Sequence, residues 1–271
     1  MEGRIITLEP TSIARYMALS QTIQESVRDG YPTTVLLSPG WKQKGLSIGK
    51  YQSVRHVNLE ACEDDRVEIV RRPTEGYAVI HYTDDVTYGA AIPREYVKSI
   101  RLTKRGFDDI VRPILFRSLE RIGVPNGYDP FPERYGNVFV DGRKISGSAQ
   151  NRDNRDAWLQ HGIIAFRTHD ARDFVRYLNG ESDLEKITSQ MTSVEEEGGI
   201  LNPNELVSVM VEEFSSHLLK LGIDLVQSSL SPEELERAEE LVRTKYTNGE
   251  WLKSRKEEKS ERVECFVWKK D

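Results

Sequence analysis

Alternating apolar and polar residues predict a series of short strands along the chain. Residues 67–70 alternate in this way and lead into a turn, after which residues 78–80 form a second apolar run. The pair Asp141-Gly142 separates two further runs and predicts a hairpin turn between them. The remaining strands are predicted at residues 3–8, 34–37, 47–52, 85–92, 137–140, 144–150, 159–166 and 265–268.

Apolar residues at helical spacing predict helices between the strands and over most of the last third. The first helix is expected to begin near Thr11 and to end at Gly30. Pro113 should kink a helix that is predicted from residue 103, or mark its start. Ser231 and Glu234 form a capping box at the start of the last helix. Other helices are predicted at residues 58–62, 170–178 and 203–221.

Composition and charge restrict the partners and the location that we expect. The chain has 271 residues, a net charge of -6 and 30% charged residues, which give no sign of a nucleic-acid footprint. The acidic run at residues 195–197 is expected to be a solvated loop. No apolar run is long enough to span a membrane and the first residues lack an apolar signal core, so a cytoplasmic location without membrane contact is expected.

The cysteines give no sign of a disulfide framework or a metal site. Only Cys62 and Cys265 are present, without metal-ligand spacing. Cys62 is expected on a short helix, and a buried structural thiol is the better interpretation there because free cysteine is usually a small core residue. We therefore expect no metal ligands in this chain.

Three stretches carry candidate chemistry. Arg71 and Arg72 follow the strand at residues 67–70 and would place planar cationic groups at its end, where they suit a carboxylate or a phosphate. Their spacing alone favours a solvated arginine pair equally well. Lys144 lies beside small residues that allow a ligand to come close, and His161 precedes a glycine at another strand.

These stretches, in this order, resemble the lipoate-protein ligase A and octanoyltransferase family, which shares its catalytic domain with biotin ligases. The family patterns are R-R-x-[ST]-G-G-[GR]-A-V-x-H, G-[KR]-K-[IL]-x-G-[SA]-A-Q and Q-H-G, and they correspond to residues 71–81, 142–150 and 160–162. Each motif alone is weak, but their order over nearly the whole chain makes them specific.

The resemblance implies an α/β (α+β) fold with a large mixed β-sheet and a smaller sheet, both flanked by helices, as in the biotin and lipoate ligases. It also implies a catalytic domain over residues 1–225, with residues 226–271 as a C-terminal helical extension packed on it. In the ligase branch, the implied activity is ATP-dependent activation of lipoate or octanoate to an acyl-AMP, followed by acyl transfer to a carrier lysine. The implied cofactors are ATP and Mg²⁺.

The resemblance also implies partners and site residues. The carriers would be lipoyl domains of 2-oxoacid dehydrogenase complexes or the glycine cleavage H protein, and a short ligase would need an accessory C-terminal domain as a separate subunit. Lys144 would be catalytic and hold the phosphate and the acyl carbonyl oxygen. The ATP and acyl group would be bound by Arg72, Gly76, Tyr77, Ala78, Val79, Ile80, His81, Lys144, Gly147, Ser148, Ala149 and His161.

The chain departs from the family pattern beside the arginines. Glu75 and Tyr77 stand where the family has glycine, so Gly76 is the glycine that remains. Glu75 adds negative charge beside a site for anions unless its side chain points to solvent. Residues 82–85 also differ from the family's continuation after the histidine. These changes leave open an altered acyl substrate or a loss of catalysis.

The octanoyltransferase branch is an alternative to the ligase. It needs a cysteine that takes the acyl chain as a thioester, and residues 128–131, where the most similar variant carries it, contain none. Cys62 or Cys265 would have to reach the pocket instead. The sequence therefore favours the ATP-dependent ligase over an ATP-independent octanoyl or lipoyl transferase between carrier proteins. A non-catalytic paralogue that binds an acyl ligand or a lipoyl domain is the third hypothesis.

Overall fold

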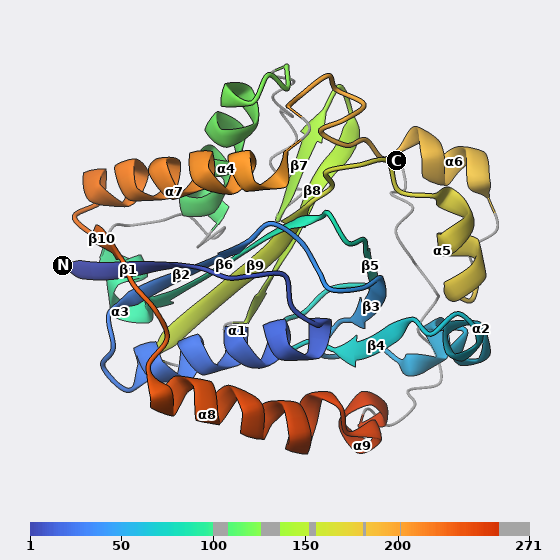
Figure 1. The fold of residues 1–271 in the computed structure, drawn as a ribbon, viewed down its shortest axis with the longest axis horizontal. Helices are drawn as coiled ribbons and strands as arrows, with labels where there is room; N and C mark the ends of the chain where they lie inside the picture. Colours follow the sequence, from blue (N-terminus) through green and yellow to red (C-terminus); the bar gives the residue numbers. More distant parts are fainter. Residues whose placement is uncertain (100–107, 126–135, 152–155, 181–182, 201, 255–271) are drawn as a thin grey trace.

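A seven-stranded mixed sheet with the strand order β10-β1-β2-β6-β9-β8-β7 forms the centre of the protein (Figure 1). The computed structural model describes residues 1–99, 108–125, 136–151, 156–180, 183–200 and 202–254. Strand β1 pairs in parallel with β10 and β2, and the other neighbours are antiparallel. The strands are β1 (Glu2–Thr7), β2 (Thr33–Ser38), β6 (Val86–Pro93), β7 (Asn137–Val140), β8 (Arg143–Asn151), β9 (Ala157–Ile164) and β10 (Asp224–Gln227).

A second sheet of three strands lies beside one end of the large sheet (Figure 1). Its central strand β3 (Gly45–Ile48) pairs in parallel with β4 (Glu68–Arg71) and antiparallel with β5 (Val79–His81). Helices α2 (Leu59–Asp64) and α5 (Ala171–Tyr177) pack their buried residues on this sheet. The two sheets confirm the α/β fold that the sequence predicts.

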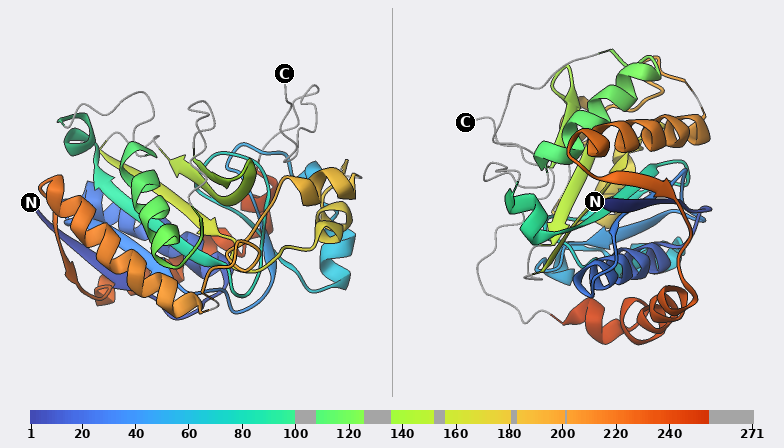
Figure 2. Two further views of the ribbon diagram at one scale, coloured as in Figure 1. Left: turned by 90° about the horizontal axis from the view of Figure 1, so that it is seen from above. Right: turned by 90° about the vertical axis from the view of Figure 1, so that its left-hand side faces the viewer.

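Helices cover both faces of the large sheet (Figure 2). Helices α1 (Ile13–Arg28) and α8 (Pro232–Leu241) bury their apolar faces on one side, and α4 (Asp108–Arg121) and α7 (Pro203–Lys220) do so on the other. No helix in the described part of the chain is long and apolar enough to cross a membrane. The remaining elements are α3 (Arg94–Ser99), α6 (Leu184–Ser189), α9 (Gly249–Lys253), the 3₁₀ turn η1 (Val54–His56) and the π-helical turn η2 (Val242–Tyr246).

Local sequence signals set several element ends as expected. The capping box of α8 is present, with Ser231 and Glu234 each bonded to the other's backbone. The hairpin turn has positive φ at Asp141 (48°) and Gly142 (78°), as a type I′ turn requires. Helix α1 is capped by Ser12, one residue after the expected Thr11. The predicted domain division after residue 225 falls within β10 and stays a prediction.

Two expectations about local structure are wrong. Residues 49–52 form a turn rather than a strand, because the Gln52 amide donates to the Gly49 carbonyl oxygen at 3.1 Å. Pro113 does not mark the start of its helix, since α4 already begins at Asp108 and buries residues on both sides of the proline. Residues 195–197 form a turn in which Glu195 and Glu196 are exposed, as expected, and Arg143 donates to the carboxylates at positions 196 and 197. The strand predicted at residues 265–268 lies outside the described residues.

Arg71 joins the small sheet to the last helix. Its side chain is 1% exposed, and its guanidinium donates to the turn after β3 and to the end of α9 at distances from 2.6 to 3.1 Å. Trp251 returns a bond from Nε1 to the Arg71 carbonyl oxygen at 2.9 Å. Arg71 is therefore a structural residue. The oxygens that it binds belong to Gly49, Lys50, Gln52, Trp251 and Leu252.

Replacing Arg71 should destabilise the fold. In Arg71→Met the buried carbonyl oxygens lose a charged donor, which should cost about 3 kcal/mol. For a chain of this size the melting temperature should fall by roughly 6–12 °C, measurable by differential scanning calorimetry. Arg172→Met is the matched control, because the Arg172 side chain is 82% exposed and its loss should change the melting temperature little. Equal shifts in both variants would contradict the structural role of Arg71.

Candidate active site

A cavity of about 200 Å³ lies between the two sheets and α1. The large sheet contributes one wall from β8 and β9, and the small sheet contributes the opposite wall from β3, β5 and the turn after β4. The cavity is mainly apolar, which suits a hydrocarbon chain. It is lined by Tyr16, Met17, Trp41, Ser47, Arg72, Gly76, Tyr77, Val79, His81, Asn137, Lys144, Gly147, Ser148, Ala149, His161, Gly162 and Ile163.

The structure brings most of the predicted site residues to this cavity. Of the predicted set, the lining includes Arg72, Gly76, Tyr77, Val79, His81, Lys144, Gly147, Ser148, Ala149 and His161. Ala78 and Ile80 are instead buried in the core of the small sheet, as expected for neighbours of Val79 in an extended segment. Ile80 also lines a smaller cavity next to the first. The binding roles of all these residues stay predictions.

Arg72 brings a buried positive charge to the small-sheet wall. Its side chain is 4% exposed and donates to Thr74 Oγ1 at 3.1 Å and to the carbonyl oxygens of Ser47 and Glu75 at 3.3 and 2.7 Å. Burial lowers the pKa of Arg72, but an arginine stays charged at neutral pH. The partners are neutral oxygens, so the charge of Arg72 is not cancelled by a carboxylate among them.

The turn after Arg72 requires glycine at position 76, which is the one glycine of the family pattern that this chain retains in the turn. Gly76 has a φ of 98°, and a Cβ on it would lie 2.8 Å from Arg72 Nη2. The Gly76 carbonyl oxygen also packs so closely on Gly49 that a Cβ there would lie 1.7 Å away. Glu75 is exposed and its side chain does not line the cavity. Its carboxylate therefore points away from the anion site, which answers the concern that the sequence raised.

Lys144 supplies the second positive charge, from β8 on the opposite wall. Its backbone amide donates to the Gln190 carbonyl oxygen at 2.9 Å. Gly147 leaves room for its side chain, because a Cβ at position 147 would lie 2.8 Å from Lys144 Nζ. Burial and then the charge of Arg72 lower the pKa of Lys144 to about 8. Lys144 is thus an ammonium group at neutral pH that is poorly solvated and suited to a negative charge.

Two histidines of the cavity are held neutral. His161 bonds through Nε2 to Thr74 Oγ1 at 2.7 Å, and burial and the charge of Arg72 lower its pKa to about 3. His81 bonds through Nε2 to Ser47 Oγ at 2.8 Å, and its pKa is lowered well below the usual value, chiefly by burial. Their hydroxyl partners and neutral state make both residues parts of the wall rather than proton carriers at neutral pH.

Trp41 is a cavity residue that the sequence did not single out. It lies in the loop between β2 and β3 and packs on His81 and Tyr16, with ring centroids 4.6 and 5.2 Å apart. Its backbone amide donates to the Thr83 carbonyl oxygen at 2.8 Å. No periodicity marks a loop residue of this kind, so only the long-range contacts place it in the site.

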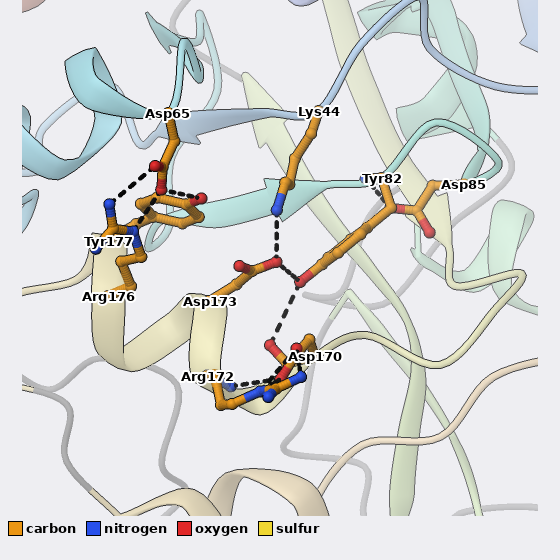
Figure 3. Close-up of polar contacts among 9 residues, drawn as sticks. All are labelled: Lys44, Asp65, Tyr82, Asp85, Asp170, Arg172, Asp173, Arg176 and Tyr177. Carbon is orange, nitrogen blue, oxygen red and sulfur yellow. Dashed lines mark hydrogen bonds and ion pairs between the residues drawn. The ribbon is translucent and has the colours of Figure 1, made fainter.

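The loop that carries Trp41 is fixed to α5 by a polar network (Figure 3). Lys44 Nζ donates to Asp173 Oδ2 at 2.9 Å, and the Tyr82 hydroxyl donates to the same oxygen at 2.6 Å. Asp65, at the end of α2, accepts a bond from the Tyr177 hydroxyl of α5 at 2.8 Å. These contacts join the loop after β2, the turn after β5 and the end of α2 to α5.

Cys62 is not positioned to act as a nucleophile. It is 1% exposed, belongs to the core of the small sheet and does not line the cavity. Burial raises the pKa of the Cys62 thiol to about 11, so the reactive thiolate is scarce at neutral pH. Cys265 and residues 128–131, where the family's cysteine would stand, lie outside the described residues.

The arrangement suits an apolar chain that ends in an anionic or polarised oxygen. Arg72 and Lys144 supply positive charge, and no carboxylate is among the described residues that line the cavity. In a site of low polarity, such charges stabilise negative charge that develops on an acyl carbonyl oxygen. Within the described ranges, no group of three or more His, Cys, Asp or Glu residues could hold a metal ion.

Comparisons with known proteins agree with this geometry. Residues 12–215 match the model of the lipoyl protein ligase A/B catalytic domain. The octanoyltransferase LipM of an Exiguobacterium species is 28% identical over 92% of this chain and 96% of its own, and that of Brevibacillus brevis is 28% identical over 92% and 98%. The bipartite lipoate protein ligase of Thermoplasma acidophilum has a similar structure, with a TM-score of 0.77, 20% identity and coverage of 96% of this chain and 100% of that one.

The curated relatives correct the expected activity. They are named octanoyltransferases, so the expectation of an ATP-dependent ligase is wrong. The structural likeness to a ligase shows the fold alone at 20% identity. The arginine and lysine motifs could not distinguish a ligase from a transferase. Both kinds of enzyme need positive charge that stabilises negative charge on the acyl carbonyl group. The family model covers well over half of the sequence, and the chain belongs to the lipoyl protein ligase A/B catalytic domain family.

Proposed function

We propose that the chain is an acyltransferase that moves an octanoyl or lipoyl group from a carrier-bound thioester to a lysine of a lipoyl carrier domain, without ATP. The observation that carries this proposal is the apolar cavity between Arg72 and Lys144, which offers positive charge but no carboxylate among its described lining. The octanoyltransferase names of the curated relatives support the same reaction class.

The cavity provides a tail site and a carbonyl site. The acyl tail would lie along Val79, Ile163 and Met17, and the thioester carbonyl oxygen would face Lys144. The acceptor amine attacks the carbonyl carbon, and the negative charge that forms on oxygen is stabilised by the Lys144 ammonium and by Arg72. The C–N bond forms, the C–S bond breaks, and the proton lost by the amine ends on the departing thiol.

The acceptor lysine is the nucleophile in this proposal. A thioester is already activated, so the attack requires neither acyl-AMP nor a covalent acyl-enzyme. Cys62 is buried away from the cavity, which supports a direct transfer over one through that thiol. The expectation that the chain binds ATP and Mg²⁺ stays a prediction, and the proposed transfer uses neither.

The partners follow from the reaction. The acceptors would be lipoyl domains of 2-oxoacid dehydrogenase complexes or the glycine cleavage H protein, and the donor would be another acylated carrier. The similar ligase of Thermoplasma acidophilum is described together with its E2 lipoyl domain, which supports a partner of that kind. A separate accessory subunit stays a prediction.

A second function, acyl binding without catalysis, is favoured by one observation. No cysteine lines the cavity in the part of the chain that the structure describes. A transferase and an acyl-binding paralogue both retain octanoate, but only a transferase consumes an octanoyl thioester. The first experiment below separates them.

Lys144→Met should abolish most of the transfer. The variant keeps the length of the side chain but removes the charge that stabilises the oxyanion, so the rate should fall on the order of 100- to 1000-fold. The assay follows octanoyl transfer from an octanoylated acyl carrier protein to an apo lipoyl domain by mass spectrometry. Lys220→Met, at the exposed end of α7, is the control and should keep the wild-type rate. Absence of transfer by the wild type would favour the acyl-binding function.

Octanoate binding should weaken as the pH rises through the pKa of Lys144. The ammonium form is present below about 8, so the affinity for the octanoate anion should fall about tenfold between pH 7 and pH 9. Titration calorimetry at several pH values measures this change. Lys144→Met should bind more weakly and show no such slope, and a wild-type affinity that is constant up to pH 9 would contradict the role of Lys144.

Direct transfer predicts that the cysteines are dispensable. The double variant Cys62→Ser, Cys265→Ser should transfer octanoyl groups within about threefold of the wild-type rate, since neither thiol takes part. Intact-protein mass spectrometry during turnover should show no octanoyl adduct of 1:1 stoichiometry on the wild type. Loss of transfer in Cys265→Ser together with a thioester adduct on the wild type would replace direct transfer by a covalent route. That result would leave the acyltransferase proposal intact.

A further inference from the structure

A smaller cavity of about 50 Å³ adjoins the cavity of about 200 Å³, here named the acyl cavity, at Lys144. The two share Val79, Lys144, Gly147 and Ile163 in their linings. If the thioester carbonyl is held at Lys144 with its tail in the larger cavity, the smaller cavity lies on the other side of the carbonyl group. That side must receive the group that attacks or leaves. The smaller cavity has room for the end of a lysine side chain.

His169 lines the smaller cavity and has a carboxylate partner. Its Nε2 lies 2.7 Å from Asp85 Oδ1, and the side chains are 8% and 0% exposed. A carboxylate only accepts hydrogen bonds, so Nε2 carries the proton and Nδ1 has the lone pair. Nδ1 has no hydrogen-bond partner among the described residues. The arrangement leaves a basic nitrogen for a group in the cavity.

Other contacts hold this pair in place. The Tyr82 ring stacks on His169 with centroids 4.2 Å apart, and the Tyr82 amide donates to Asp85 Oδ2 at 2.9 Å. Tyr82 is itself bonded to Asp173 on α5, as Figure 3 shows. The imidazole thus has a fixed ring plane, a fixed tautomer and a carboxylate that orients it.

The other cavity histidines bond to hydroxyl groups instead of a carboxylate. His81 and His161 bond to the hydroxyl groups of Ser47 and Thr74, and both have a strongly lowered pKa because they are buried near Arg72. Among the histidines that line the two cavities, His169 is the one with a carboxylate partner in the described structure. The carboxylate at Nε2 therefore distinguishes His169 from the other two histidines.

We propose that His169 is the general base of the transfer and that Asp85 is its positioning residue; this inference rests on the proposed acyltransferase function. The acceptor lysine is an ammonium ion at neutral pH and must lose a proton before or during its attack. His169 Nδ1 takes that proton and releases it to solvent, which returns the imidazole to its neutral form. The second proton that the nitrogen loses, as the C–N bond forms, passes to the sulfur as the C–S bond breaks.

The test compares two acceptor amines in the complete chain. The donor is an octanoylated acyl carrier protein, and the acceptors are an apo lipoyl domain and hydroxylamine, which is uncharged at neutral pH. His169→Gln should slow transfer to the lipoyl domain on the order of 100-fold or more, because its lysine ammonium needs a base. Transfer to hydroxylamine should stay within about threefold of the wild-type rate. Asp85→Asn should show the same selective loss.

His217→Gln is the matched control, since His217 lies on α7 and bonds to Arg117. It should leave both transfers unchanged. Equal losses with both acceptors in His169→Gln would mean that His169 only supports the fold, and no loss with the lipoyl domain would mean that no base is needed there; either result overturns the inference. A wild type that transfers to neither acceptor would overturn the proposed function, and this inference with it.

Discussion

The buried charge of Arg72 determines the electrostatics of the whole site. Its guanidinium lies between the two sheets, held by neutral oxygens, and its field reaches the opposite wall. Burial is the larger cause of the lowered pKa of Lys144 and of His161, and the charge of Arg72 lowers both further. The cavity therefore combines apolar walls, neutral histidines and two cations. A negative charge placed there is stabilised more strongly than in water, because little solvent competes for the donors.

The two consecutive arginines have different roles because they lie where β4 ends, at Arg71. Side chains of neighbouring extended residues point to opposite sides, so one faces the cavity and the other faces away. Arg72 meets the ligand wall, and Arg71 reaches the carbonyl oxygens of the turn after β3 and of α9. The same alternation takes Ala78 and Ile80 into the core while Val79 and His81 line the cavity. Of the two arginines in the motif, only Arg72 therefore lines the cavity, and Arg71 stabilises the fold.

The acyl cavity and the smaller cavity divide the proposed reaction between them. Lys144 lines both cavities, so its side chain lies beside the proposed position of the reacting carbonyl group. Ligases and transferases share the need for a charged group at that carbonyl. They differ in how the acyl group is activated, which a shared lysine and arginine cannot reveal. The correction from ligase to transferase therefore changes the donor and leaves the role proposed for the charged residues unaltered.

The sequence by itself determined most of the strands, though not β10, together with the hairpin turn, the capping box and the three motifs, since these depend on periodicity and on residues close together in the chain. It also predicted most of the cavity lining, from Arg72 to His161. Only the tertiary structure placed Trp41 on the wall and His169 beside Asp85, because loops far apart in sequence meet there. It likewise decided that Arg71 binds backbone, that Glu75 faces solvent and that Cys62 is core. Each of these outcomes depends on which residues, distant in sequence, bond to a polar group or bury an apolar one. The local sequence pattern does not specify those contacts.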